Sequence, residues 1–230
     1  MVKMTSQLSS AKNALSVLVL ALVIALYLFA NSNFFETDKI EWTGLAHLSP
    51  EQLDLFVDFP LTNVWRVDTR ELVSLLKEHP WVETAKATWR WPNRLIVQVK
   101  ERTPIAQTPT PGGWVFLDHE GGILPPTQAG AVYSLPIVTN CDLSSAEQLV
   151  AAARLITMIP TNLQDIISEW NAATRSFVTR TGTEILMGQP VDLEEKFILL
   201  EKILEDLAVR SEQAKRIDLR VPKSPVISIL

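Results

Sequence analysis

The chain of 230 residues contains a single cysteine, Cys141, and few basic residues. Without a second cysteine an intramolecular disulfide is excluded, so the fold depends on its apolar core and its hydrogen bonds. Only 21 lysines and arginines stand against 26 acidic residues, which leaves a net charge of −5. A chain with this charge balance offers no basic stripe to neutralise phosphates, and this argues against a nucleic-acid partner.

The common catalytic and phosphate-binding motifs are also missing: the sequence has no H-E-x-x-H, G-x-S-x-G, G-x-G-x-x-G or phosphate loop. The histidines, His47, His79 and His119, fall in separate predicted turns. Asp118, His119 and Glu120 could form a metal-binding or acid–base cluster, but adjacent strand and turn residues point in different directions. We therefore expect no enzyme, no catalytic residue, no cofactor or metal, and no small-molecule substrate.

One long part of the sequence, residues 13–35, lacks charge altogether. A helix of about 23 residues measures about 35 Å, which is enough to cross a hydrocarbon core of about 30 Å. This length predicts a single transmembrane helix. A cleaved signal peptide is the alternative, but its apolar region is shorter and ends at a small-x-small site, which the large Leu28 before Phe29-Ala30 does not fit.

The charges on either side of residues 13–35 predict the orientation of this helix. Lys3 and Lys12 precede it without an acid, whereas Glu36 and Asp38 follow it. The positive-inside bias therefore places residues 1–12 in the cytoplasm as a short tail and the rest of the chain outside it.

Residues 36–104 show the pattern of a small α+β unit. Polar and apolar residues alternate directly after the apolar run, which predicts a strand. Ser49 and Asp68 each precede an amphipathic segment and are suited to cap a helix. Two further alternating segments, 82–91 and 95–100, are joined by a Pro-Asn turn and predict a hairpin. The order is β-α-α-β-β, a plausible single domain.

Four motifs in this order resemble the POTRA domain of the bacterial division protein family FtsQ/DivIB, in which the domain directly follows one transmembrane helix. The motifs are Val64-Trp65-Arg66-Val67-Asp68, His79-Pro80-Trp81-Val82, Trp89-Arg90-Trp91-Pro92 and Val99-Lys100-Glu101-Arg102-Thr103-Pro104. Each motif alone is weak, and their order carries the resemblance.

The resemblance continues through residues 105–230. Residues 114–124 match a strand–D-x-x-G–strand hairpin of the family, and Asp192-Leu193-Glu194-Glu195 predicts a capping box at the start of a long amphipathic helix. We therefore expect an α+β protein with an N-terminal transmembrane helix. A POTRA domain (36–104) and a mixed β-sheet domain with flanking helices (105–230) would follow.

The predicted last strand has no following element to cover its outer edge. Pro225 suits an edge position, and an apolar edge invites association with another strand. In FtsQ/DivIB relatives this strand and the preceding helix form the docking site for FtsB/DivIC-type partners. The resemblance thus implies partner-binding roles for Val226, Ile227, Ser228, Ile229 and Leu230 on the strand and Lys196 on the helix. A strand that closes its own sheet and a solvated helix face are the alternatives.

The family resemblance implies a non-enzymatic, bitopic membrane scaffold of the bacterial divisome. Such a scaffold would recruit and link division proteins at the septum and regulate septal peptidoglycan synthesis. Its expected partners are FtsB/DivIC-like and FtsL-like bitopic coiled-coil proteins, and its expected location is the inner or plasma membrane. The alternative is a POTRA-type extracytoplasmic chaperone or transport component that binds client strands by β-augmentation, although the chain is too short to contain an outer-membrane barrel. A membrane-anchored hydrolase lacks a supporting motif.

Overall fold

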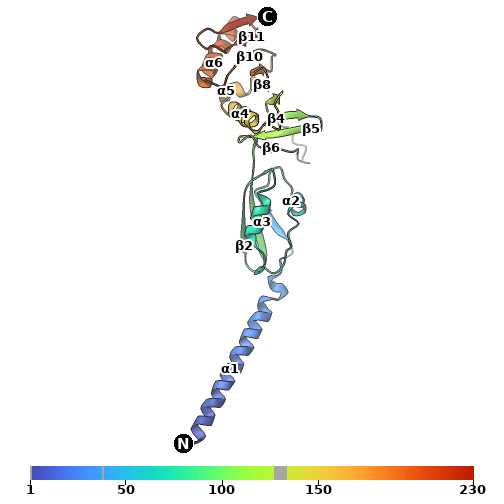
Figure 1. Ribbon diagram of the computed structural model, residues 1–230, viewed down its shortest axis with the longest axis vertical. Coiled ribbons are helices and arrows are strands. Elements are labelled where there is room, and N and C mark those ends of the chain that lie inside the picture. The colour runs from blue at the N-terminus through green and yellow to red at the C-terminus, as the bar shows by residue number, and fades with distance from the viewer. Residues whose placement is uncertain (1, 38, 127–133) are drawn as a thin grey trace. The chain divides into compact units, whose positions relative to one another are not determined.

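The computed structural model describes residues 2–37, 39–126 and 134–230 (Figure 1). Two residues used in the predicted topology lie outside the described residues. They are Met1, at the start of the predicted cytoplasmic tail, and Asp38, one of the acidic residues after the predicted transmembrane helix. The chain divides into two compact units, Met1–Glu101 and Arg102–Leu230, each with helices and a sheet. The α+β prediction is therefore confirmed.

The first unit begins with helix α1 (Val2–Ala30) and the short 3-10 helix η1 (Asn33–Phe35). The helix thus ends at Ala30, before the predicted end at Phe35, because Phe35 turns into the unit and is buried. Among the described residues, no helix is both long enough and apolar enough to cross a membrane.

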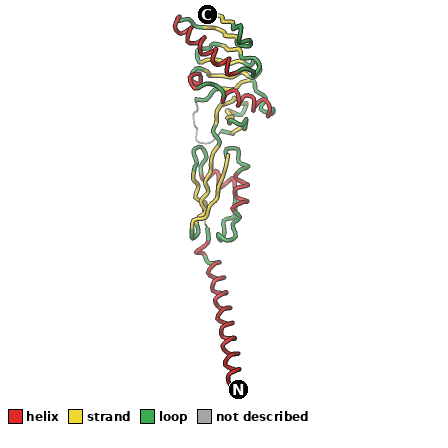
Figure 2. The backbone as a smooth tube through the Cα atoms, turned by 90° about the vertical axis from the view of Figure 1, so that its left-hand side faces the viewer, coloured by secondary structure: helices red, strands yellow, loops and turns green. Residues whose placement is uncertain are grey.

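A three-stranded sheet forms the centre of the first unit, in the order β1-β3-β2. Its elements are β1 (Ile40–Thr43), α2 (Pro50–Val57), α3 (Thr69–Leu76), β2 (Val82–Arg90) and β3 (Arg94–Glu101). Strand β3 pairs in parallel with β1 and antiparallel with β2. Figure 2 shows the strands of this unit in yellow on one side and its helices in red on the other. This is the predicted β-α-α-β-β order.

The two helices of the first unit begin where the sequence predicts. Ser49 and Gln52 form a reciprocal capping box on α2, and the Asp68 carboxylate accepts hydrogen bonds from two backbone N–H groups of α3. Caps of this kind stabilise a helix by about 1 kcal/mol. Both helices bury leucines against the sheet, where Trp81 is only 1% exposed.

The loop between β1 and α2 is held by the carboxylate of Glu101. It accepts hydrogen bonds from the backbone N–H groups of Ala46, His47 and Leu48 at 3.0, 2.8 and 3.1 Å, and from the His47 ring at 2.8 Å. Burial acts to raise the pKa of Glu101, but these hydrogen bonds together hold it below its ordinary value. Glu101 therefore serves as the ionised anchor of this loop.

The second unit is built on a nine-stranded mixed sheet, in the order β12-β11-β10-β9-β8-β7-β4-β5-β6. The strands are β4 (Pro104–Thr110), β5 (Gly113–Asp118), β6 (Ile123–Leu124), β7 (Ile137–Thr139), β8 (Ile167–Asn171), β9 (Ser176–Thr179), β10 (Glu184–Leu186), β11 (Ala214–Asp218) and β12 (Val226–Ile229). Three pairs are parallel, namely β4 with β7, β7 with β8, and β10 with β11. The sheet therefore depends on contacts between distant segments.

Three helices accompany this sheet: α4 (Ala146–Thr157), α5 (Thr161–Gln164) and α6 (Leu193–Arg210). One continuous core includes residues of α4, α5 and α6 with the buried side chains of the sheet. The capping box predicted at Asp192 is wrong. Asp192 has a left-handed backbone (φ 53°) and makes no side-chain cap hydrogen bond, whereas a capping residue needs an extended backbone.

Candidate partner-docking site

Strand β12 forms one end of the nine-stranded sheet. It pairs antiparallel with β11, and no other strand of the described chain pairs with it. In this register Val226 lies opposite Asp218 and Ile227 lies opposite Ile217. The outer edge of β12 is therefore open.

The side chains along β12 are apolar and exposed. Val226 is 63% exposed, Ile227 39%, Ile229 46% and Leu230 76%. Isolated exposed apolar residues are common on proteins, but a row of them along an unpaired strand is a template for another strand. We call Val226–Leu230 the docking edge.

The two faces of the docking edge differ. Ile227 lies opposite Ile217, which is fully buried in the core that includes α6. Residues opposite each other share a face, and alternate residues of a strand share a face. Ile227 and Ile229 therefore lie at the open end of the apolar layer under α6. An added strand would continue this layer.

The backbone of the docking edge has hydrogen-bonding groups directed outward. The N–H of Leu230 donates to the carbonyl of Gln213, at 3.0 Å, on the β11 side. Inward and outward groups alternate along an antiparallel strand. The N–H and C=O groups of Ile227 and Ile229 consequently face the open side, where an added strand would bind them.

Ion pairs fix the polar face beside the docking edge. Arg216 binds Glu184 at 2.7 Å, and Arg220 binds Asp218 at 2.6 Å. The hydrogen bond from Arg220 holds the pKa of Asp218 below its ordinary value. Lys215 on β11 is exposed as well. The positive side chains beside the docking edge are therefore partly neutralised, because the two arginines are paired with acidic residues of the same unit.

Lys196, predicted from the resemblance to bind a partner, lies in the interior and is 1% exposed. Its Nζ donates hydrogen bonds to the carbonyls of Met187 and Gln189, at 2.8 and 3.0 Å. Burial lowers the pKa of Lys196, and the charge of Asp192 opposes this shift. The amine therefore holds the segment that leads into α6 in this conformation. The predicted partner-binding role of Lys196 stays a prediction.

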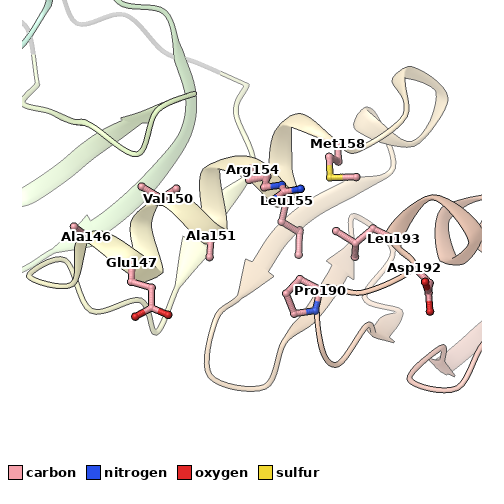
Figure 3. A pocket seen from close by; sticks show the side chains of 10 residues that line it. All are labelled: Ala146, Glu147, Val150, Ala151, Arg154, Leu155, Met158, Pro190, Asp192 and Leu193. Atoms are coloured by element: carbon pink, nitrogen blue, oxygen red, sulfur yellow. The ribbon is translucent and has the colours of Figure 1, made fainter.

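An apolar groove of about 640 Å³, which no sequence motif predicted, lies between α4 and the start of α6 (Figure 3). Val150 and Leu155 of α4 and Met158, which follows directly after α4, line one side of it, and Pro190 and Leu193 form the opposite side. The groove joins segments that are far apart in the sequence, so no local pattern indicated it.

Asp118 and Glu120, which could have formed a metal-binding or acid–base cluster, both bind Arg102 at 2.7 Å. Asp118 is fully buried and also accepts hydrogen bonds from the N–H groups of Glu120 and Gly122. These bonds close the β5–β6 hairpin. Among the described residues, no group of three or more potential metal-ligating side chains was found.

The architecture of the first unit, with two helices on a β1-β3-β2 sheet, defines a POTRA domain, and the family model of the FtsQ-type POTRA domain matches residues 35–102. The C-terminal model of the cell division proteins FtsQ/DivIB matches residues 106–220. The chain belongs to the FtsQ/DivIB family. The second match ends at residue 220 and does not include the docking edge.

Known relatives agree with this assignment. The chain is 30% identical over 199 residues to the cell division protein FtsQ of Myxococcus fulvus, covering 80% of this chain and 69% of the relative. It is 26% identical over 212 residues to FtsQ of Anaeromyxobacter sp., covering 84% of this chain and 70% of the relative. It is 27% identical over 194 residues to FtsQ of Chloroflexus aurantiacus, covering 79% of this chain and 71% of the relative.

Proposed function

We propose that this cell division protein is a non-enzymatic scaffold of the bacterial divisome, which binds other division proteins by strand addition at the docking edge. Family membership supports the role in division. The observation that carries the mechanism is the open, apolar β12 at the end of a large sheet. Recruiting partners in this way would link them at the septum and regulate septal peptidoglycan synthesis.

Both backbone hydrogen bonds and side-chain burial would contribute to the free energy of strand addition at β12. The outward N–H and C=O groups of Ile227 and Ile229 would gain hydrogen bonds worth about 0.5–1.5 kcal/mol each. Covering the exposed parts of these two side chains, 39% and 46% of their surfaces, would add about 1 kcal/mol each. These contributions are sufficient for specific binding only in combination with further contacts of the partner.

The partners that best fit this role are FtsB/DivIC-like and FtsL-like bitopic coiled-coil proteins. Such partners would present a segment that can extend along β12. Lys215 and the nearby Lys223 are both exposed, which favours an acidic partner strand. Lys196 would influence binding indirectly, through the segment that it holds.

We also propose that residues 13–30, the part of the predicted 13–35 span that lies within α1, anchor the protein in the inner or plasma membrane as a single span. The tail 1–12 would then be cytoplasmic, and the domains 36–104 and 105–230 would be extracytoplasmic. The uncharged sequence and the exposure of apolar side chains from Leu15 to Phe29 support this anchor. The positive charges before it support the orientation.

The decisive experiment for this function is a comparison of affinity captures from envelope extract. The full chain would be compared with a chain truncated after Lys223, and captured proteins would be identified by mass spectrometry. We expect the full chain alone to capture bitopic coiled-coil division proteins. Equal capture by both would move the docking site away from β12, and capture of no division protein by either would contradict the scaffold function.

The truncated chain must be shown to fold before its capture is interpreted. Thermal unfolding followed by circular dichroism gives this control, because removal of an edge strand should leave most of the core of the second unit in place. A chain with Ile229→Lys, which keeps β12, is the second variant. It should lose the same partners as the truncated chain.

A further inference from the structure

Five aromatic residues gather around η1 in the first unit. Phe35 lies at the centre, and its ring centroid is 5.2 Å from that of Phe29, 5.1 Å from Phe34, 5.8 Å from Trp65 and 5.2 Å from Trp91. These distances are typical of packed aromatic pairs. The five rings come from α1, η1, the loop before α3 and the β2–β3 turn, so they form one continuous cluster.

The four outer rings of this cluster are exposed. Phe29 is 55% exposed, Phe34 53%, Trp65 61% and Trp91 67%, whereas Phe35 is 2% exposed. We call the four outer residues the aromatic patch. A contiguous patch of large exposed rings is unusual on a surface that faces water and marks an interaction site.

Hydrogen bonds fix the segments that carry the aromatic patch. The side-chain amide of Asn63 donates to the carbonyl of Ala30 at 2.7 Å, and the guanidinium of Arg66 donates to the Asn31 side chain at 2.9 Å. The N–H of Val64 donates to the carbonyl of Phe35 at 2.9 Å. The rings are therefore presented by a defined framework.

Arginines accompany the aromatic patch along the chain. Arg66 directly follows Trp65, and Arg90 directly precedes Trp91; both are exposed. Arg94 is also exposed and pairs with Glu41 at 3.2 Å. Exposed aromatic rings beside guanidinium groups match the chemistry of the membrane interface, where the rings lie at headgroup level and the cations meet lipid phosphates.

We propose that the aromatic patch is a membrane-contact surface that inserts into the headgroup region of an anionic phospholipid bilayer. The patch directly continues from the apolar end of α1, and this continuity favours lipid over a protein partner. The inference rests on the proposed membrane anchor. Its consequence is that the POTRA domain is held against the membrane surface by its own side chains as well as by the anchor, which restricts its rotation.

The test uses the full chain reconstituted in vesicles of phosphatidylglycerol and phosphatidylcholine. Part of the phosphatidylcholine carries bromine near the headgroup end of its acyl chains, and bromine quenches nearby tryptophan fluorescence. We expect the chain with Trp65→Phe and Trp91→Phe to lose most of the bromolipid-dependent quenching. The matched control is Trp114→Phe, which removes another exposed tryptophan, 44% exposed, from β5. It should leave the quenching unchanged.

A further variant tests the charge. Arg90→Gln should lower the ratio of membrane-inserted to free aromatic patch on the order of fivefold in anionic vesicles. In vesicles of phosphatidylcholine alone this variant should change nothing. All substituted side chains are exposed, and circular dichroism checks that the fold is kept.

Vesicle flotation, performed first, separates the two proposals. A chain that does not float contradicts both the anchor and the membrane-contact surface. A chain that floats, but whose quenching is unaffected by the Trp65 and Trp91 substitutions or is lowered equally by Trp114→Phe, contradicts the membrane-contact surface alone. Neither result bears on partner capture at β12, which tests the scaffold function separately.

Discussion

Replacing Lys196 by methionine removes a buried charge and two hydrogen bonds at nearly constant volume. In the native chain its Nζ lies 2.8 Å from the carbonyl oxygen of Met187 and 3.0 Å from that of Gln189. Lys196→Met leaves both carbonyls without this donor in a part of the structure where the replaced side chain is 1% exposed. The segment before α6 should therefore lose its main anchor.

The magnitude follows from two opposing terms. A hydrogen bond to a charged group contributes about 1.5–3 kcal/mol, so the loss of two amounts to about 3–6 kcal/mol. Part of this is recovered, because the variant no longer desolvates an ammonium group, a cost that is visible in the lowered pKa of Lys196. We expect a net loss of about 2–3 kcal/mol in the free energy of unfolding. For a unit of this size the melting temperature should fall by about 6–15 °C.

Differential scanning calorimetry of the full chain measures this change in the transition of the second unit. The matched control is Lys202→Met on the same helix, where the lysine is exposed and the expected change is below about 0.5 kcal/mol. An equal melting temperature for the two variants would refute the positioning role. So would a fully stable Lys196→Met chain that binds its partner more weakly, because that result requires a direct contact.

Two further predictions concern the POTRA domain. Because the folded pKa of Glu101 is lowered, its contribution to stability is present above its unfolded pKa of about 4.3 and is lost as pH falls through the folded pKa. Urea unfolding of the native chain and of Glu101→Gln should therefore differ by about 2–3 kcal/mol at pH 7 and converge in acid; a constant difference would contradict this. Gly44→Ala should destabilise the same domain by more than about 2 kcal/mol, because Gly44 has φ 82° and its Cβ would collide with the carbonyl of Val99. Gly113→Ala, at φ 119° with open space around it, is the control and should cost less.

Local signals in the sequence predicted the first unit well. The capping box of Ser49 and Gln52 is confirmed, as is the β2–β3 hairpin, in which Ala87 lies opposite Val97. Each of these features depends on residues close together in the chain, so propensity and spacing suffice to find them. The end of α1 was predicted too late because the burial of Phe35 depends on the distant Trp65 and Trp91.

Distant contacts explain most of what the sequence did not reveal in the second unit. No strand was predicted over Pro104–Thr110, yet β4 lies inside the sheet between β5 and β7. Its prolines make this segment a poor match to the usual pattern of an inner strand. Strand β7 pairs with β4 in parallel, and Gln107 of β4 lies opposite Ile137 of β7. Such pairings join segments separated by long connections and leave no local pattern.

The candidate site was predictable only where it depends on residues close together in the chain. The apolar character of residues 226–230 and the proline before them indicated an edge strand, and the structure has β12 at the end of the sheet. The location of Lys196 was not predictable, because a lysine in an acidic helix is ordinarily exposed. Only the fold places the carbonyls of Met187 and Gln189 within reach of its amine.

The most direct test of strand addition is the affinity of the full chain for the extracytoplasmic part of a captured partner, measured by isothermal titration calorimetry. Ile227→Lys with Ile229→Lys should weaken binding by about 2–4 kcal/mol, or roughly 30- to 1,000-fold, because two side chains at the docking edge become charged. The control, Val209→Lys, alters an apolar residue of α6 that is 85% exposed and should change the affinity by less than about twofold. An unchanged affinity of the double variant, or an equal loss in the control, would contradict docking at β12.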